Sequence, residues 1–343
     1  MKATPALSSL CLALILVAGA RADDTAPAPV LLRYRFTPEE CRSYDLSVTG
    51  QGQLQVAGTA IPLDMTVAGC FDLLTRSVDP DGSGHVGLHL APLNLDMTVM
   101  GQAMHMTMDL EKGKFTMNGQ ETPAPGAGAA GAAPQGGLDL SKLTVVLSPQ
   151  GKVTDVQGLD ELLASLPPGA QRMPGASLML PHLKEMLQNN ASPLPDGPVA
   201  VGATWDQPIK FALPGLPPVT GGDIKCTLAK LAVINGHQFA RINSTGNCHL
   251  QDLPMLPAPG QPAGGKIDDL TAQITGQTYF DVTEGFMHSA HLEVTLNMQL
   301  TNAAPAAGAA PAAGAPPLQM SLQGLKLYYN IYPHGQESAA AKM

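Results

Sequence analysis

The sequence predicts a mainly β fold: antiparallel, strongly curved sheet in two halves, arranged as a half-barrel or a sandwich, with two short helices between them. Three observations lead to this prediction. Apolar and polar residues alternate with a period of two over long stretches, turn residues separate those stretches, and a helical period appears only near the middle of the chain.

Residues 1–22 have the pattern of a secretory signal peptide. Lys2 is basic, Leu10–Val17 is an unbroken apolar run, and Ala20-Arg21-Ala22 supplies small residues before a cut at Asp23. The apolar run has about half of the ~20 residues that a membrane-spanning helix needs. We therefore expect an exported, secreted or periplasmic protein with no integral membrane segment after cleavage.

The N-terminal β half, expected over residues 23–195, shows its clearest alternation at 93–99, where Leu, Met and Val alternate with Asn, Asp and Thr. One face of such a strand is buried and the other meets water, which is typical of antiparallel sheet. The segment Asp79-Pro-Asp-Gly-Ser-Gly interrupts two strand-like runs and predicts a hairpin turn.

Two central helices are predicted from their apolar spacing. In the first, leucines recur at positions i, i+3, i+4 and i+7, namely Leu159, Leu162, Leu163 and Leu166. The second runs from Pro181 to Asn190, begins with a proline that suits a first helical turn, and turns Leu183, Met186 and Leu187 inward.

The C-terminal β half is expected over residues 196–335, with alternation at 292–300 and hairpin turns at Asn235-Gly236 and Thr283-Glu284-Gly285. Apolar positions change parity within 318–331, which predicts a bulge near Gly324. The run that starts at Cys70 and the run that starts at Cys226 echo each other. The echo fits an internal duplication and fits two independent halves equally well.

Three segments rich in Ala, Pro and Gly, at 121–137, 256–265 and 303–317, interrupt pairs of strand-like runs. Such sequence buries little surface and cannot offset the entropy of ordering it. We therefore expect low-complexity loops that extend hairpins rather than linkers between domains.

Composition excludes some partners. The net charge is −9, charged residues make up 14% of the chain and aromatic residues 4%. Nucleic-acid binding needs a Lys- and Arg-rich surface, and stacking of bases or sugars needs aromatic platforms. We expect no nucleic-acid partner.

Four cysteines remain after the predicted cleavage: Cys41, Cys70, Cys226 and Cys248. An even number in an exported protein favours two disulfides, for which three connectivities exist. We favour the local pairs, Cys41 with Cys70 and Cys226 with Cys248, over free buried thiols.

Metal sites are not expected. The segment rich in Met and His could offer thioethers to Cu(I), but on a strand Met104, Met106 and Met108 share one face and His105 points to the other. A core or groove lining is favoured. Asp79–Gly84 matches the start of a calcium loop, yet the twelfth position is Leu90 rather than Glu.

The spacing of the histidines does not suit a metal site, and the known catalytic motifs are absent from the sequence. His85 and His89 would lie about 13 Å apart on a strand, and His288 and His291 would project from opposite faces. The sequence contains no G-x-S-x-G elbow, H-E-x-x-H pair, phosphate-binding loop or dinucleotide fingerprint. We expect no cofactor and no enzymatic activity.

Several motifs resemble those of a family of secreted bacterial proteins of unknown function. They are Tyr34-Arg-Phe, Leu147-Ser-Pro-Gln-Gly-Lys-Val, Pro198-Val-Ala-Val-Gly-Ala-Thr-Trp and Tyr279-Phe-Asp-Val-Thr-Glu-Gly. The family carries an aromatic first strand, an S-P-x-G-x-V hairpin, a P-V-x-V-G-x-x-W entry and an F-D-x-x-x-G hairpin. The resemblance implies a bacterial exported protein and brings no known activity.

Two functions follow as hypotheses. The first is a non-catalytic structural or interaction module of the cell envelope, with packed sheets and an envelope protein as partner. The alternative is a carrier of an apolar ligand, a lipid or lipoprotein acyl chain, which resembles the half-barrel-plus-lid architecture of periplasmic carriers. The expected groove residues are Met104, Met106, Met108, Val294, Leu296, Leu162, Leu163 and Met186.

Overall fold

A computed structural model describes residues 28–56, 58–109, 111–112, 114–122, 140–165, 193–211, 219–254, 266–301 and 319–335. The predicted signal peptide, the predicted helix at 181–190 and nearly all of the three low-complexity segments lie outside these residues.

The described chain is dominated by strands. They are β1 (Cys41–Val56), β2 (Thr59–Val78), β3 (Gly84–Leu90), β4 (Leu93–Val99), β5 (Gln102–Asp109), β6 (Lys114–Met117), β7 (Gln120–Thr122), β8 (Thr144–Leu147), β9 (Val153–Gln157), β10 (Thr204–Phe211), β11 (Val219–Ile234), β12 (His237–Pro254), β13 (Lys266–Asp281), β14 (Phe286–Thr301) and β15 (Gln319–Pro333). A short 3-10 turn, η1 (Leu140–Lys142), and one α-helix, α1 (Leu159–Ser165), complete the described elements.

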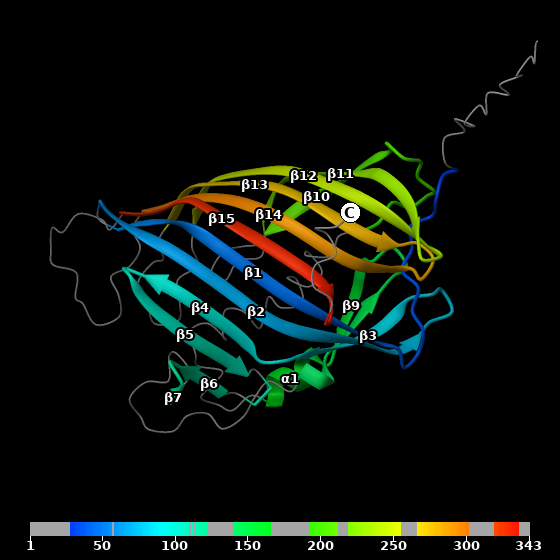
Figure 1. The fold of residues 1–343 in the computed structure, drawn as a ribbon, viewed down its shortest axis with the longest axis horizontal. Helices are drawn as coiled ribbons and strands as arrows, with labels where there is room; N and C mark the ends of the chain where they lie inside the picture. Colours follow the sequence, from blue (N-terminus) through cyan, green and yellow to red (C-terminus); the bar gives the residue numbers. More distant parts are fainter. Residues whose placement is uncertain are drawn as a thin grey trace, which may run out of the picture.

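All these strands belong to one antiparallel sheet. Its main path runs in the order β10-β11-β12-β13-β14-β15-β1-β2-β4-β5-β6-β7, and β3, β8 and β9 branch from it at β2. The last long strand, β15, pairs with both β14 and β1, and so joins the two halves of the chain into one surface. The sheet curls without closing into a barrel, and its ends turn to the far side in Figure 1. The predicted mainly β fold, with a strongly curved antiparallel sheet of half-barrel or sandwich type, is confirmed.

The sheet divides at β2. Residues 63–68 of β2 pair with β4, and residues 71–78 pair with β3, which continues to β8 and β9. Ala91-Pro92 separates β3 from β4, and proline has no N–H to donate to a ladder. Two parts of the sheet, which we call wings, therefore branch from β2: one contains β4–β7 and the other contains β3, β8 and β9.

The predicted turns are confirmed. Asn235 and Gly236 both have positive φ, at 52° and 85°, between β11 and β12, as a type I′ hairpin requires. The bulge is also present: Gly324 has φ of 57°, and the register of β15 shifts beside it against both neighbours. The Gly324 N–H donates to Asn297 Oδ1 at 2.7 Å.

The predicted first helix is confirmed as α1, and it contains Leu162, which is fully buried. Two acidic residues in its first turn, Asp160 and Glu161, complement the positive end of the helix dipole. The helix follows β9 and contacts η1, so it sits at the wing formed by β3, β8 and β9.

A buried core covers one face of the sheet at β10–β13. Leu32 and Leu194, from segments that precede the sheet strands, pack with Leu228, Ile242 and Phe280. The N-terminal segment is held by reciprocal backbone hydrogen bonds between Val30 and Val199, both 2.9 Å long. The segment that carries Val30, Leu32 and Tyr34, which we call the strap, therefore covers this end of the sheet.

Candidate functional site

Strand register places the apolar residues of many strands in continuous rows on one face. One row runs through Ile224, Gly246, Ile274, Val294, Leu327, Gly50, Met65, Met97 and Met104, from β11 to β5. A second runs through Cys226, Ser244, Gly276, Leu292, Tyr329, Val48, Val67, Leu95 and Met106. Neither row contains a charged residue. We call this surface the apolar face.

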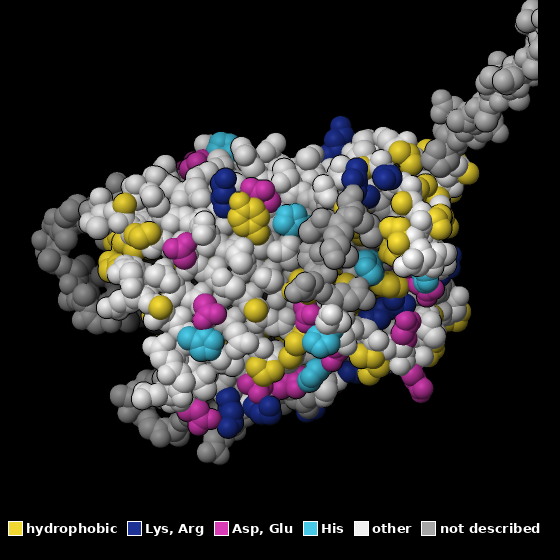
Figure 2. Space-filling view, viewed as in Figure 1, with side chains coloured by type: hydrophobic (Ala, Val, Ile, Leu, Met, Phe, Trp, Pro, Cys, Tyr) yellow, Lys and Arg dark blue, Asp and Glu magenta, His cyan; other side chains and the backbone are white. Residues whose placement is uncertain are grey.

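The apolar face is the concave one. The ends of the sheet curl away from the viewer in Figure 1, and the face toward the viewer in Figure 2 shows few hydrophobic side chains over the middle of the sheet. The residues that alternate with the rows are mostly uncharged and polar, such as Thr49, Thr271, Gln273 and Thr295. The sheet is therefore apolar inside its curve and polar outside.

Burial differs along the apolar face. At β10–β13, Leu228 and Ala240 are 0% exposed and Phe280 is 1% exposed. From β14 to β5 the side chains of the same rows are mostly half-buried, as are Val294, Leu327 and Met65. We call these the packed region and the half-buried region.

Five of the predicted groove residues lie on the apolar face. Val294 and Leu296 pack against the buried cluster that contains Ile267 and Leu270. Met104, Met106 and Met108 are half-buried on β5. Val294 and Met104 share a row but are five strands apart, or about 24 Å along the sheet. They therefore line a broad surface rather than one compact pocket.

The other three predicted groove residues are not placed on this surface. Leu162 is fully buried in α1. The side chain of Leu163 and all of Met186 lie outside the described residues.

The predicted disulfides are wrong: all four cysteines are free. Cys41 pairs in register with Leu74 and Cys70 with Asp45, so the two cysteines are four residues out of register. Cys226 pairs with Ser244, again four residues from Cys248. Four residues span about 13 Å on a strand, whereas the Cα atoms of a disulfide lie about 4.4–6.8 Å apart.

The predicted calcium-like segment is the hairpin turn between β2 and β3. Asp81 Oδ1 accepts a hydrogen bond from the Ser83 N–H at 2.9 Å, and Asp79 Oδ2 lies 3.0 Å from His85 Nε2. His89, on the same strand as His85, pairs instead with Glu111. Each carboxylate of the turn is engaged within the hairpin.

Histidine–carboxylate pairs recur on the polar face. His105 Nδ1 lies 2.6 Å from Asp96 Oδ1, and His249 Nε2 lies 2.6 Å from Asp269 Oδ1. A third pair joins His334 Nδ1 to Asp45 Oδ1 at 2.7 Å. These pairs connect neighbouring strands at the surface.

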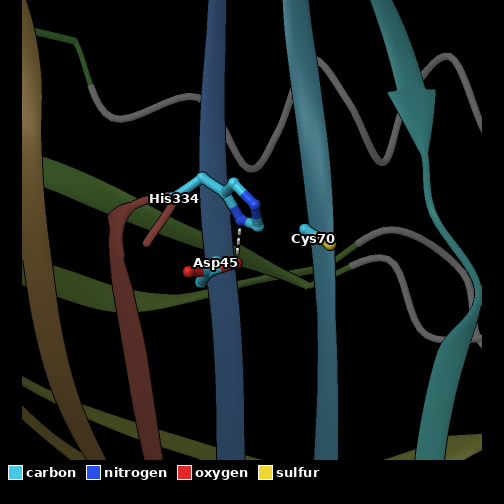
Figure 3. Close-up of side chains that lie close together, drawn as sticks. All are labelled: Asp45, Cys70 and His334. Atoms are coloured by element: carbon cyan, nitrogen blue, oxygen red, sulfur yellow. Dashed lines mark hydrogen bonds and ion pairs between the residues drawn. The ribbon is translucent and has the colours of Figure 1, made fainter. Parts of the chain in front are cut away.

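The third pair has a thiol beside it. Asp45 and Cys70 are register partners on β1 and β2, and His334 follows the end of β15, so the three side chains converge on one spot (Figure 3). One ligand atom from each lies within 4.8 Å of the others. Among the described residues, no other such group of three His, Cys, Asp or Glu side chains occurs.

Electrostatics within this cluster favour the ion pair. A hydrogen bond from His334, followed by one from the Gly335 N–H, lowers the pKa of Asp45. The same bond and the charge of Asp45 raise the pKa of His334, and the charge of Asp72 raises it further. Sequence reasoning missed this cluster because Asp45 and His334 are 289 residues apart, and only strand register brings them together.

Comparison with known proteins gives distant structural likenesses. A lipovitellin structure, described by its lipid–protein interactions, is 10% identical with a TM-score of 0.39, covering 89% of this chain and 26% of that chain. This chain thus spans about a quarter of the lipovitellin chain. A DUF1329 family protein from Desulfovibrio piger is 7% identical with a TM-score of 0.13, covering 87% of this chain and 89% of that one. Neither likeness is close enough to bear on function.

Other comparisons add no relative. No family model matches the chain, and no curated protein is similar to it in sequence. In the part of the chain that the structure describes, no helix has the length and apolar character needed to cross a membrane.

Proposed function

We propose that this protein is an exported, non-catalytic carrier that binds the acyl chain of a lipid on the half-buried region of its apolar face. The observation that carries the proposal is the continuity of the rows: apolar side chains and glycines follow one another from β14 to β5 on the inside of the curve. The signal peptide predicted at residues 1–22 and the resemblance to secreted bacterial proteins support the location.

The chemistry of the surface supports an aliphatic ligand. The rows offer Leu, Val and Met but no charged side chain, so a charged ligand group would find no partner there. Methionine side chains adapt to irregular apolar shapes because they are unbranched and flexible. Four methionines, Met65, Met97, Met104 and Met106, meet where β2, β4 and β5 pair. This surface suits a flexible chain better than a rigid ring.

The polarity of the opposite face of the sheet also supports binding on the apolar face. The Thr, Gln and Asn side chains of the polar face contact water on the convex side of the sheet. An apolar ligand is therefore removed from water only on the concave side. Removing apolar area from water contributes about 25 cal/mol per Å². Binding therefore requires no catalytic group.

The test is binding of a long-chain fatty acid and of a phospholipid to the purified mature chain, measured by native mass spectrometry and by displacement of an apolar dye. We expect a stoichiometric complex with each lipid. The double variant Met97→Gln, Met104→Gln keeps side-chain volume but adds amides without partners. We expect it to weaken binding by about tenfold, since a partnerless amide costs about 1–3 kcal/mol.

A matched control is Thr98→Gln, because Thr98 neighbours Met97 on the same strand but projects from the polar face. It should bind as the unaltered protein does. Absence of any lipid complex, with dye binding also absent, would overturn the carrier proposal and favour a structural or interaction module of the envelope.

A further inference from the structure

The geometry points to a metal site on the polar face, formed by Asp45, Cys70 and His334, for a divalent ion of the zinc class. This inference is independent of the carrier proposal because the site lies on the opposite face of the sheet. The three residues come from β1, from β2 and from the position directly after β15, where the two halves of the chain join.

The backbone already holds the three groups close together. Asp45 and Cys70 face each other across β1 and β2, and the His334 N–H donates to the Ser43 carbonyl at 2.9 Å. The Gly335 N–H donates to Asp45 Oδ2 at 3.0 Å, which leaves Oδ1 directed at the imidazole. Figure 3 shows the imidazole joined to the carboxylate by their hydrogen bond, with Cys70 beside them on the neighbouring strand.

The distances suit a tetrahedral ion after small side-chain rotations. Zinc binds sulfur at about 2.3 Å and nitrogen or oxygen at about 2.0–2.2 Å, which places neighbouring ligand atoms roughly 3.3–3.8 Å apart. The ligand atoms here lie within 4.8 Å of one another, and His334 is exposed while Asp45 and Cys70 are half-buried. Rotation of these side chains can therefore close the site without moving a strand.

The donor set selects the class of ion. Thiolate and imidazole favour zinc and similar borderline metals, whereas Ca²⁺ and Mg²⁺ prefer oxygen ligands only. Three protein ligands leave one position for water or a further ligand. Asp72 lies two residues from Cys70 on β2, and its carboxylate adds negative potential for a cation.

The other histidine–carboxylate pairs provide a built-in contrast. His105 with Asp96 and His249 with Asp269 have equally short contacts but no cysteine in their clusters. If a histidine–carboxylate pair were enough, all three places would bind metal equally. The thiol of Cys70 is the feature that sets one place apart.

The test is titration of the reduced full mature chain with Co²⁺ alone and then with Zn²⁺. We expect one tight Co²⁺ per chain with a sulfur-to-cobalt charge-transfer absorption that Zn²⁺ abolishes. Cys70→Ser should remove that absorption, and His334→Ala should weaken Co²⁺ binding by more than about tenfold, since losing even a supporting group costs 10–100-fold.

Two controls keep the test decisive. Cys41→Ser removes an exposed thiol outside the cluster, and His105→Ala removes a histidine of a pair that lacks a thiol; neither should change Co²⁺ binding. Absence of the charge-transfer absorption in the unaltered chain would overturn the inference. So would an absorption that persists in Cys70→Ser or disappears in Cys41→Ser. Lipid binding by Cys70→Ser should be unchanged, which separates failure here from failure of the carrier proposal.

Discussion

The packed and half-buried regions belong to one face of one sheet, yet their side chains have different surroundings. In the packed region, Leu228 and Phe280 lie beneath the strap that carries Leu32 and are almost completely buried. In the half-buried region, Leu327 and Met65 occupy the same row pattern but keep part of their surface accessible. The rows themselves are equally apolar.

Residue type alone therefore does not decide whether part of an apolar face is fully buried or stays half-buried. The strap makes its own contacts: Tyr34 stacks edge-on against Phe280 with ring centroids 5.3 Å apart, and burial raises the pKa of Tyr34 to about 12. A segment from the chain itself covers the packed region. In our proposal, the acyl chain of a lipid covers part of the other.

Truncating one leucine in each region should change the stability of the fold by very different amounts. Leu228→Ala should lower the free energy of unfolding by about 2–5 kcal/mol, because it leaves a cavity under the strap. Leu327→Ala should cost less than about 2 kcal/mol, because a half-buried side chain removes less surface from water. Urea unfolding followed by circular dichroism measures both. Equal losses would erase the distinction between the regions.

The cysteines of the two faces should differ in how fast they react with a thiol reagent, which is a smaller effect than the stability difference above. Burial raises the pKa of Cys248 to about 11 and also raises that of Cys226, and both lie in buried clusters of the apolar face. We expect Cys41 and Cys70 to react with an aromatic disulfide reagent in the native protein and the other two only after unfolding. Intact mass after timed labelling gives the count. Early labelling of Cys226 would show that the packed region opens.

The smallest effect concerns the ion pair on the polar face. The raised pKa of His334 means that its contribution to stability is present below the ordinary histidine value of 6.5 and is lost as pH rises through the raised value. The lowered pKa of Asp45 means that its contribution is lost as pH falls through that lowered value, below 3.8. The pair therefore stabilises the fold between these limits.

Asp45→Asn tests this pair directly. Removing the charge should lower the pKa of His334 in an NMR titration with a chelator present, since the hydrogen bond and the charge of Asp45 raise it. As a control, Asp96→Asn, which removes the partner of His105, should leave the His334 titration unchanged. An unchanged His334 titration would show that the Asp45 contact does not persist in solution.

Much of the fold could be predicted because period-two alternation, Asn-Gly turns and the parity change at Gly324 are local signals. The disulfides could not, because pairing depends on register, and Cys41 and Cys70 sit four residues out of register on adjacent strands. The alternation at Met104, Met106 and Met108 predicts that these side chains share one face, and register places all three on the apolar face. The difference between packed and half-buried regions could not be read from the strands, since Leu32 and Leu194 create it from elsewhere in the chain.

The most direct test of the carrier account is to map where a photoactivatable long-chain fatty acid labels the mature chain, using peptide mass spectrometry. The account predicts labelling on the apolar face from β14 to β5, with peptides carrying Val294, Leu327 and Met104 among those modified. It also predicts competition by unlabelled fatty acid. Labelling confined to the polar face, or labelling that unlabelled fatty acid does not reduce, would contradict it.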